Sequence, residues 1–435
     1  MMLLMWILTK KHKSYKTKFL ETLLGICLLT MSGCATTSEP PVTATPLPTM
    51  EVVEETYEDY SSLYEKKILV SQDTPLYLLN EEGLKEVGVV HQNAFVDLGS
   101  ESYKNTVCLR NSSYYIEADS LQKSDRWFQH HNHLLGLQQH IVTNTSYRLE
   151  NLKEEVVMTM NQEDTYEVYV LPGEEDPRYG VYFLNDIYYI PEEDIKTIEN
   201  TMAVPKEAYA ESIPVLMYHF LYDENETKDR PNTNYVEQKE YDEQLSTLND
   251  EGYQSLTMRE ILYFMERRAY VPEKSFAITI DDGDPSVYTY GFPILKKYGM
   301  NATLFLIGAW EDTNLSWQNW EMREEGIELQ SHSFDMHQGG CSGMGHGGRL
   351  LCVDYATGVE DTKMGFDYVD GGFVYCYPFG DVNEHAIEII KDGGAKLAFT
   401  TEFGKINLDM DPLNLPRIRV IGGNGLEFFM KNIKE

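Results

Sequence analysis

Two neighbouring carboxylates and a later pair of histidines are the residues that could do chemistry. Asp281 and Asp282 follow the apolar run SFAITI and precede Gly283, and His332 and His337 lie about fifty residues further on. Two imidazoles and a carboxylate form a donor set for a divalent cation, with positions left for water and substrate. Because Asp-Asp-Gly is also a common turn, the histidines carry the hypothesis of a metal site.

The spacing of the two histidines constrains the backbone that carries them. His332 and His337 are five residues apart, whereas one helix face needs a spacing of three or four and one side of a strand needs multiples of two. A loop or a bend must therefore bring them together, as happens where a barrel strand runs out into its loop.

Strand patterns alternate with helical patterns from about residue 200 onward. The strand patterns cover 213–218, 276–280, 302–308, 327–333, 373–380 and 397–403. The helical patterns cover 238–253, 258–268, 291–299 and 384–394. Thr257 and Glu260 have the spacing of a capping box before the second helix. This alternation predicts an α/β fold, a distorted parallel (β/α) barrel of seven or eight strands.

Reactive groups in such a barrel collect at the C-terminal ends of its strands. His219, Asp281, Asp282, His332 and the segment YPFG (377–380) all follow strand patterns. The architecture therefore predicts that these residues are neighbours.

Five motifs together resemble a known family. In chain order they are IPVLMYH, FAITIDDG, NATLFLIG, SHSFDMH and YPFG. They resemble the polysaccharide deacetylase domain (NodB homology, carbohydrate esterase family 4) over 199–435, and the branch that deacetylates poly-β-1,6-N-acetylglucosamine is the most similar. The resemblance implies a metal-dependent N-deacetylase that acts on N-acetylglucosamine units of a cell-surface polysaccharide, either poly-N-acetylglucosamine or peptidoglycan.

The resemblance also implies a role for each site residue. Asp281 is expected as the general base, and Phe379 is expected to offer its backbone N–H to the tetrahedral oxyanion. His219 is expected to protonate the leaving amine, because the C-terminal Leu-x-His motif of many relatives is missing. The metal, zinc by default with cobalt, nickel or iron as alternatives, would be bound by Asp282, His332 and His337.

Several alternatives stay open. The same site could remove O-acetyl groups, or the chain could be a non-catalytic cell-wall-binding lipoprotein. His219 could be a strand-end histidine without a catalytic role, and Arg417 and Arg419 could either orient Asp281 or lie on the surface. Asp335 is expected to cap a turn, and Ser333 is expected to hydrogen-bond within the loop.

The N-terminal segment predicts export. Residues 1–33 combine a lysine-rich start with the apolar run LLGICLLTM, which is typical of a signal peptide. The ending Met-Ser-Gly-Cys resembles a bacterial lipobox and implies lipidation of Cys34, and hence attachment to the extracellular side of the cell membrane; an uncleaved signal anchor is the alternative. Residues 34–62, rich in Thr, Pro and acidic residues, predict a disordered linker.

The next part of the chain repeats itself. VCLRNSSYYIEADSL (107–121) aligns without gaps on VYFLNDIYYIPEEDI (181–195). Residues 63–125 and 126–198 are therefore predicted to be two small all-β domains. They resemble bacterial SH3-like domains, which implies a cell-wall glycan as ligand; a spacer without a ligand is the alternative. His130, His131 and His133 are interpreted as linker or interface residues.

Cysteines and net charge add two expectations. Cys341 and Cys352 could form a disulfide across a glycine-rich stretch, or with His346 they could form a second metal site. The chain carries 70 acidic against 36 basic residues, a net charge of −34. Such a surplus of negative charge argues against a nucleic acid as partner.

Overall fold

A computed structural model of the 435-residue chain describes residues 66–110, 112–127, 133–200, 208–226, 232–310, 322–323 and 327–435. All of these belong to one compact unit, Thr56–Glu435. The predicted signal peptide (1–33), the lipidation site Cys34 and the linker (34–62) lie outside the described residues. Within the described ranges no helix is long and apolar enough to cross a membrane.

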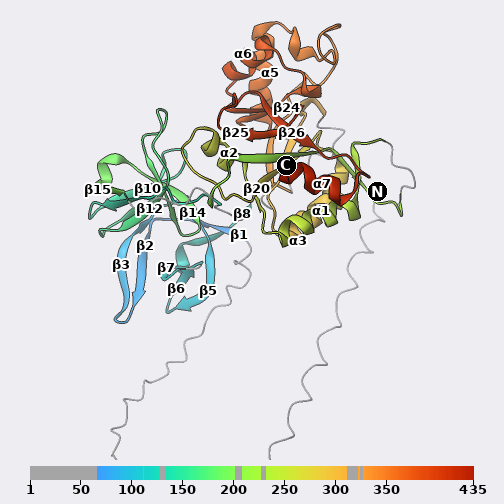
Figure 1. The fold of residues 1–435 in the computed structure, drawn as a ribbon. Coiled ribbons are helices and arrows are strands. Elements are labelled where there is room, and N and C mark those ends of the chain that lie inside the picture. The colour runs from blue at the N-terminus through green and yellow to red at the C-terminus, as the bar shows by residue number, and fades with distance from the viewer. Residues whose placement is uncertain are drawn as a thin grey trace, which may run out of the picture. The chain divides into compact units, whose positions relative to one another are not determined.

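Seven parallel strands close into a barrel in the C-terminal part of the chain (Figure 1). In spatial order around the ring they are β16 (Ser212–Tyr218), β20 (Ser275–Asp281), β21 (Thr303–Leu306), β22 (Glu328–Ser331), β23 (Val374–Cys376), β24 (Leu397–Phe403) and β26 (Leu415–Arg419). Strand β16 pairs in parallel with both β20 and β26, which closes the ring. The predicted (β/α) barrel is confirmed, with seven strands.

Helices cover the outside of the barrel, and four of the six main helices were predicted. The predicted ones are α1 (Gln238–Asp250), α2 (Met258–Met265), α3 (Phe292–Tyr298) and α6 (Glu384–Asp392). Helix α2 begins with the expected capping box between Thr257 and Glu260. Helices α5 (Tyr355–Tyr368) and α7 (Gly425–Lys434) and strand β26 were not predicted from the sequence.

Short strands complete the barrel's surroundings. β19 (Gln254–Ser255) pairs in parallel with β20, and β25 (Lys405–Asn407) pairs antiparallel with β16. β17 (Phe220–Tyr222) and β18 (Tyr235–Glu237) form a separate parallel pair. Every residue of β20, β21 and β23 is buried, because helices cover the outer face and side chains fill the interior.

One acidic residue ties strands and helices together at the N-terminal ends of the strands. Oε2 of Glu328, the first residue of β22, accepts hydrogen bonds from Met258 N at the start of α2 (2.8 Å) and from Thr303 Oγ1 (3.0 Å). Burial raises the pKa of this carboxyl to about 6. Glu328 is therefore mainly ionised near neutral pH, although its buried environment disfavours the charged form.

The region before the barrel is all-β. Its strands are β1 (Lys66–Val70), β2 (Thr74–Asn80), β3 (Gly83–Val90), β4 (Phe95–Val96), β5 (Leu98–Tyr103), β6 (Thr106–Leu109), β7 (Tyr114–Glu117), β8 (Leu121–Trp127), β9 (Gln139–Thr143), β10 (Tyr147–Glu150), β11 (Val156–Met160), β12 (Thr165–Val170), β13 (Tyr179–Phe183), β14 (Asp186–Ile190) and β15 (Ile195–Asn200). Three of them form the sheet β4-β1-β8, and the other twelve form one antiparallel sheet.

The two aligned stretches fold into the same order of elements. The first contains β6, β7, a 3-10 turn (Ala118–Ser120) and β8, and the second contains β13, β14, a 3-10 turn (Glu192–Asp194) and β15. The last strand of each pairs with the first strand of its own repeat, β8 with β1 and β15 with β9. Strand β11 pairs with β3 across the two repeats, so a single sheet runs through both.

His133, one of the histidines between the repeats, contacts the barrel. Its backbone N donates to Glu260 Oε1 at 2.6 Å, and its Nδ1 lies 3.3 Å from the same carboxylate. This contact agrees with the predicted interface role of His133. His130 and His131 lie outside the described residues.

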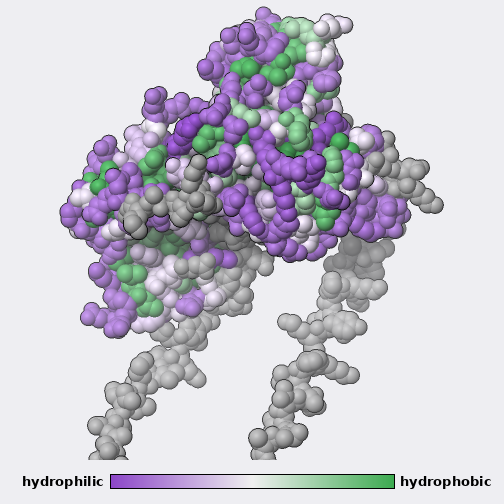
Figure 2. All heavy atoms as spheres, viewed as in Figure 1, coloured by the Kyte–Doolittle hydropathy of each residue, from purple (hydrophilic) through white to green (hydrophobic). Residues whose placement is uncertain are grey.

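The visible face of the protein is mainly hydrophilic, with small, separate hydrophobic patches (Figure 2). Such a surface is expected for a chain with a net charge of −34.

Candidate active site

The two aspartates mark the point where β20 leaves the barrel. Asp281 is the last residue of β20 and is 2% exposed. Asp282 has a left-handed backbone conformation with φ of 73°, which costs energy for a residue with a side chain and is typical of functional sites. The turn directs the two adjacent carboxylates to different partners.

Asp281 forms a buried ion pair with Arg417 of β26. Arg417 is fully buried; its Nη1 donates to Asp281 Oδ1 and its Nη2 to Oδ2, each at 2.7 Å. Nε of Arg417 donates to Thr400 O at 2.9 Å, and Nη1 also donates to Thr279 Oγ1 at 3.0 Å. Burial alone would raise the pKa of Asp281, but the guanidinium outweighs burial and holds the pKa well below its ordinary value. Asp281 is therefore an ionised and fixed carboxylate.

Asp282 faces the two histidines. Its Oδ1 lies 3.6 Å from Nε2 of His332 and 3.5 Å from Nε2 of His337. His332 directly follows β22, and its Nδ1 lies 2.8 Å from the backbone O of Cys376. Because a carbonyl can only accept, Nδ1 carries the hydrogen, and the Nε2 lone pair is directed toward Asp282. The loop after β22 thus brings together the two histidines, as their spacing predicts.

The electrostatics of this group favour a bound cation. Burial, followed by the neighbouring charges of Asp281 and Asp284, raises the pKa of Asp282 to about 7. Burial lowers the pKa of His332 to about 3 and also lowers that of His337. Both imidazoles are therefore neutral near pH 7, as metal ligands must be. The raised pKa of Asp282 shows that burial and the neighbouring carboxylates outweigh the opposing effect of Arg417.

Within the described part of the chain, two overlapping groups have donor atoms close enough to share a metal ion: Asp282 with His332 and His337, and Asp281 with His332 and Cys376. The second group is the poorer one. Arg417 already bonds both oxygens of Asp281, and its Nη2 also donates to Cys376 Sγ at 3.1 Å. A cation there would face a buried guanidinium at close range. The residues therefore fit a metal best at Asp282, His332 and His337.

His219 and Phe379 border the same site. Nε2 of His219, one residue after β16, lies 3.9 Å from Asp281 Oδ2, and burial lowers the pKa of His219. Phe379 lies in the turn Pro378–Gly380 after β23, with φ of 61°. Its ring centroid is 4.5 Å from that of His337, and the side chain is 38% exposed. All six predicted site residues of the barrel are thus close to one another or to a shared neighbour.

The structure resolves several alternatives. Arg417 orients Asp281, whereas the exposed Arg419 donates to Asn234. Ser333 is buried, and its Oγ accepts from Met336 N at 3.1 Å within the loop. Asp335 is exposed; its Oδ2 lies 3.4 Å from Nη1 of Arg349, and it belongs to neither metal-type group.

Cys341 and Cys352 form the predicted disulfide. Neither cysteine is therefore a thiolate ligand, and His346 contacts Asp381 instead, with its Nδ1 2.9 Å from Oδ1. The alternative of a second metal site at these residues is not supported.

Two residues of the site were missed. The buried thiol of Cys376 lies 3.6 Å from Asp281 Oδ2, and its backbone O orients His332. The ring of Trp310, which is 39% exposed, contacts the ring of His337 at 5.3 Å between centroids. Cys376 directly precedes YPFG at the end of a strand pattern, and this position could have predicted that it lies at the site. No pattern in the sequence points to Trp310 in this way.

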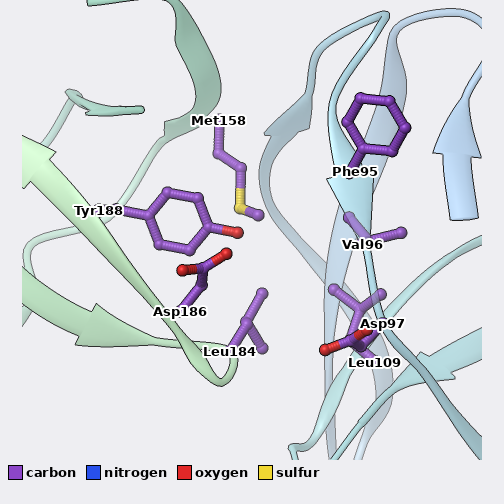
Figure 3. A pocket seen from close by; sticks show the side chains of 8 residues that line it. All are labelled: Phe95, Val96, Asp97, Leu109, Met158, Leu184, Asp186 and Tyr188. Carbon is purple, nitrogen blue, oxygen red and sulfur yellow. The ribbon is translucent and has the colours of Figure 1, made fainter. Parts of the chain in front are cut away.

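A separate small hollow lies in the all-β region (Figure 3). It is lined by residues of both repeats, including Asp97 and Leu109 from the first and Asp186 and Tyr188 from the second. Its volume of about 10 Å³ is roughly the space that one water molecule needs. The hollow is too small for a sugar ring, so a glycan would have to bind the repeats at another place.

The fold and the candidate site define a (β/α)-barrel protein with a metal-type cluster at the C-terminal ends of its strands, and comparisons with known proteins identify its family. The profile of the family described as polysaccharide deacetylase matches residues 268–398. A protein of Bacillus subtilis (strain 168) named as a candidate polysaccharide deacetylase, YxkH, is 30% identical over 233 residues, which are 52% of this chain and 78% of that protein. The chain belongs to the polysaccharide deacetylase family.

Two further matches are similar in extent. The poly-β-1,6-N-acetyl-D-glucosamine N-deacetylase of Staphylococcus aureus (strain MRSA252) is 28% identical over 227 residues, covering 49% of this chain and 76% of that protein. The solved structure of the deacetylase PplD of Streptococcus pyogenes, in complex with acetate, is 25% identical, with a TM-score of 0.46; the match covers 52% of this chain and 99% of that one.

Proposed function

We propose that the protein is a metal-dependent N-deacetylase that removes acetyl groups from N-acetylglucosamine units of a cell-surface polysaccharide. The observation that carries this proposal is the convergence of the His332 and His337 Nε2 atoms on Asp282 Oδ1, within 3.6 Å, beside the separate carboxylate of Asp281. The printed name of the S. aureus relative supports a polymer of N-acetylglucosamine as substrate. Zinc is the expected metal, since two imidazoles and a carboxylate suit it.

An amide is a poor electrophile, so the reaction needs both an activated water and a polarised carbonyl. A divalent cation held by Asp282, His332 and His337 would supply both effects when bound. The protein's own part is to keep the two imidazoles neutral and their Nε2 atoms aimed at one point. The bond from His332 Nδ1 to Cys376 O does this for one of them.

The protons must also balance. Attack of water on the acetyl carbon releases one proton, which the fixed carboxylate of Asp281 can accept. Cleavage of the C–N bond requires one proton on the leaving nitrogen. His219, with its Nε2 3.9 Å from Asp281 Oδ2, is placed to receive that proton and to deliver it. Acetate and a free amine are then the products.

The developing oxyanion needs hydrogen-bond donors. The left-handed turn at Phe379 belongs to the segment that follows β23, at the same end of the barrel as His337. The backbone N–H of Phe379 is the proposed donor, and removing one such donor typically costs 10²- to 10³-fold in rate.

The test is acetate release from β-1,6- and β-1,4-linked N-acetylglucosamine oligomers by the zinc-loaded protein. The variant Asp281→Asn should lose about 10²- to 10⁴-fold in kcat while still binding zinc. Asp409→Asn is the control, because Asp409 is 93% exposed and its carboxylate pairs with surface Arg267. Activity on O-acetyl esters alone would replace the proposal with an esterase, and a wild type that binds oligomers but releases no acetate would make the protein a wall-binding protein.

We also propose that the chain is exported and lipid-anchored through Cys34, and that its two repeats bind cell-wall glycan. Lipid anchoring is tested by labelling cells with a palmitate analogue: Cys34→Ala should remove the label and release the protein from the membrane.

Glycan binding by the repeats is tested by sedimentation of residues 63–198 with purified cell walls. A label that survives the substitution, or a fragment that stays in the supernatant, would contradict the respective idea.

A further inference from the structure

A disulfide-closed loop directly follows the histidine His337. The loop spans 338–353 and leads to α5, and the Cys341–Cys352 disulfide closes most of it. Gly339 and Gly348 form an antiparallel bridge across the loop, and Arg349 N donates to Gln338 O at 2.8 Å. The ends of the loop are therefore tied to each other beside His337.

Asp381 attaches this loop to the other side of the site. Its carboxylate is buried, with 5% exposure, and it accepts from His346 N and Gly348 N at 2.8 Å each. Nδ1 of His346 lies 2.9 Å from the same carboxylate. A buried carboxylate that gathers three donors from one loop holds that loop firmly, because breaking the bonds leaves a desolvated charge without compensation.

The loop reaches His337 through Phe379. A Cβ at Gly348 would lie 3.2 Å from Cδ2 of the Phe379 ring, so the loop backbone packs on that ring. The same ring also contacts His337, 4.5 Å away between centroids. Asp381 itself stands two residues after Phe379. The loop therefore restrains both a proposed ligand and the proposed oxyanion donor.

We infer that Asp381 is a positioning residue and that, together with the Cys341–Cys352 disulfide, it holds the loop 338–353 as the support of His337 and Phe379. Neither Asp381 nor the disulfide touches the reacting atoms; they act through the loop. The inference rests on the proposed function, because it takes His337 as a ligand.

The test uses the full chain with Asp381→Asn, which keeps size but replaces an acceptor oxygen by an amide. Zinc affinity is measured by competition with a chromogenic chelator, and the geometry of the site is followed by the visible spectrum of the cobalt-loaded protein. We expect about tenfold weaker zinc binding, a typical effect of an outer support of a metal site, and a changed cobalt spectrum. Acetate release should show a lower kcat with a nearly unchanged KM.

Asp409→Asn is the matched control, because it removes a carboxylate that is 93% exposed and pairs with Arg267 rather than with the loop, and it should leave zinc affinity and spectrum as in wild type. If Asp381→Asn does not fold, Cys341→Ser combined with Cys352→Ser tests the same loop with the same readouts. Wild-type zinc affinity and cobalt spectrum in whichever variant folds would overturn the inference. A wild type that binds zinc but releases no acetate would overturn the proposed function and leave the zinc comparison intact.

Discussion

Arg417 donates to both carboxylate oxygens of Asp281 at 2.7 Å, and both side chains are almost completely buried. A buried charge pair with one partner removed is strongly destabilising, by about 3–5 kcal/mol. The pair therefore couples the stability of the barrel to the ionisation of the proposed base.

Arg417→Lys should weaken this pair, because an ammonium is a point charge and cannot bond both oxygens in one plane. We expect kcat to fall by roughly 10²-fold. The guanidinium lowers the pKa of Asp281, so the pKa rises in the variant. The base works only when it is ionised. As the pH is lowered, the variant should therefore lose activity at a higher pH than wild type does. Arg419→Lys is the control. If Arg417→Lys loses activity at the same acidic pH as wild type, Arg417 does not set the pKa of Asp281.

Zinc affinity should depend on pH through Asp282. Its pKa is raised to about 7, whereas the pKa of His332 is lowered to about 3. Below pH 7 one proton must leave Asp282 for each ion bound, so the dissociation constant should rise about tenfold per pH unit. Zinc competition between pH 5 and 8 measures the slope. Asp282→Asn should bind zinc weakly, without this slope, and a wild type with no slope in this range would refute the assignment.

His219 can be tested by changing the leaving group. If His219 protonates the departing amine, His219→Gln should slow amide hydrolysis by about 10²-fold or more. The same variant should hydrolyse an activated aryl ester nearly as fast as wild type, because a phenolate leaves without a proton. Asp281→Asn should be slow on both substrates. Equal losses of His219→Gln on both substrates would assign His219 to another step.

Glu328 should make the fold less stable as pH rises. Its pKa is raised to about 6 from 4.5, so the folded state disfavours the charged form, and stability is lost between pH 4.5 and about 6. Glu328→Gln keeps an acceptor for Met258 N and Thr303 Oγ1. It should raise the free energy of unfolding by about 1 kcal/mol at pH 8 and have little effect at pH 4.5. Urea unfolding at pH 4.5 and at pH 8 measures this change. A Glu328→Gln variant that is less stable than wild type at pH 8 would show that the fold needs the carboxylate.

The barrel and the aspartate–histidine cluster were predictable because their signals are local. Apolar strand patterns that end in acidic residues or histidines indicate the C-terminal ends of barrel strands, and this pattern can be found in the sequence alone. The role of Arg417 stayed undecided because its partner is distant along the chain, and a short strand such as β26 does not reveal whether a charge points inward.

Helix α5 was missed for a different reason. Gly358 and Gly365 lower its helix propensity, yet both are required by close packing. A Cβ at Gly358 would lie 2.7 Å from Ile389, and one at Gly365 would lie 2.4 Å from Ser331 Oγ. Tertiary contact thus outweighs local preference there, and only the folded chain shows this.

The pairing of β3 with β11 has a consequence for dissecting the protein. Cutting the chain between the repeats would leave each half with an unprotected strand edge, whose free N–H and C=O groups invite association with other molecules. A single repeat produced alone should therefore oligomerise or precipitate, whereas the two together should stay monodisperse.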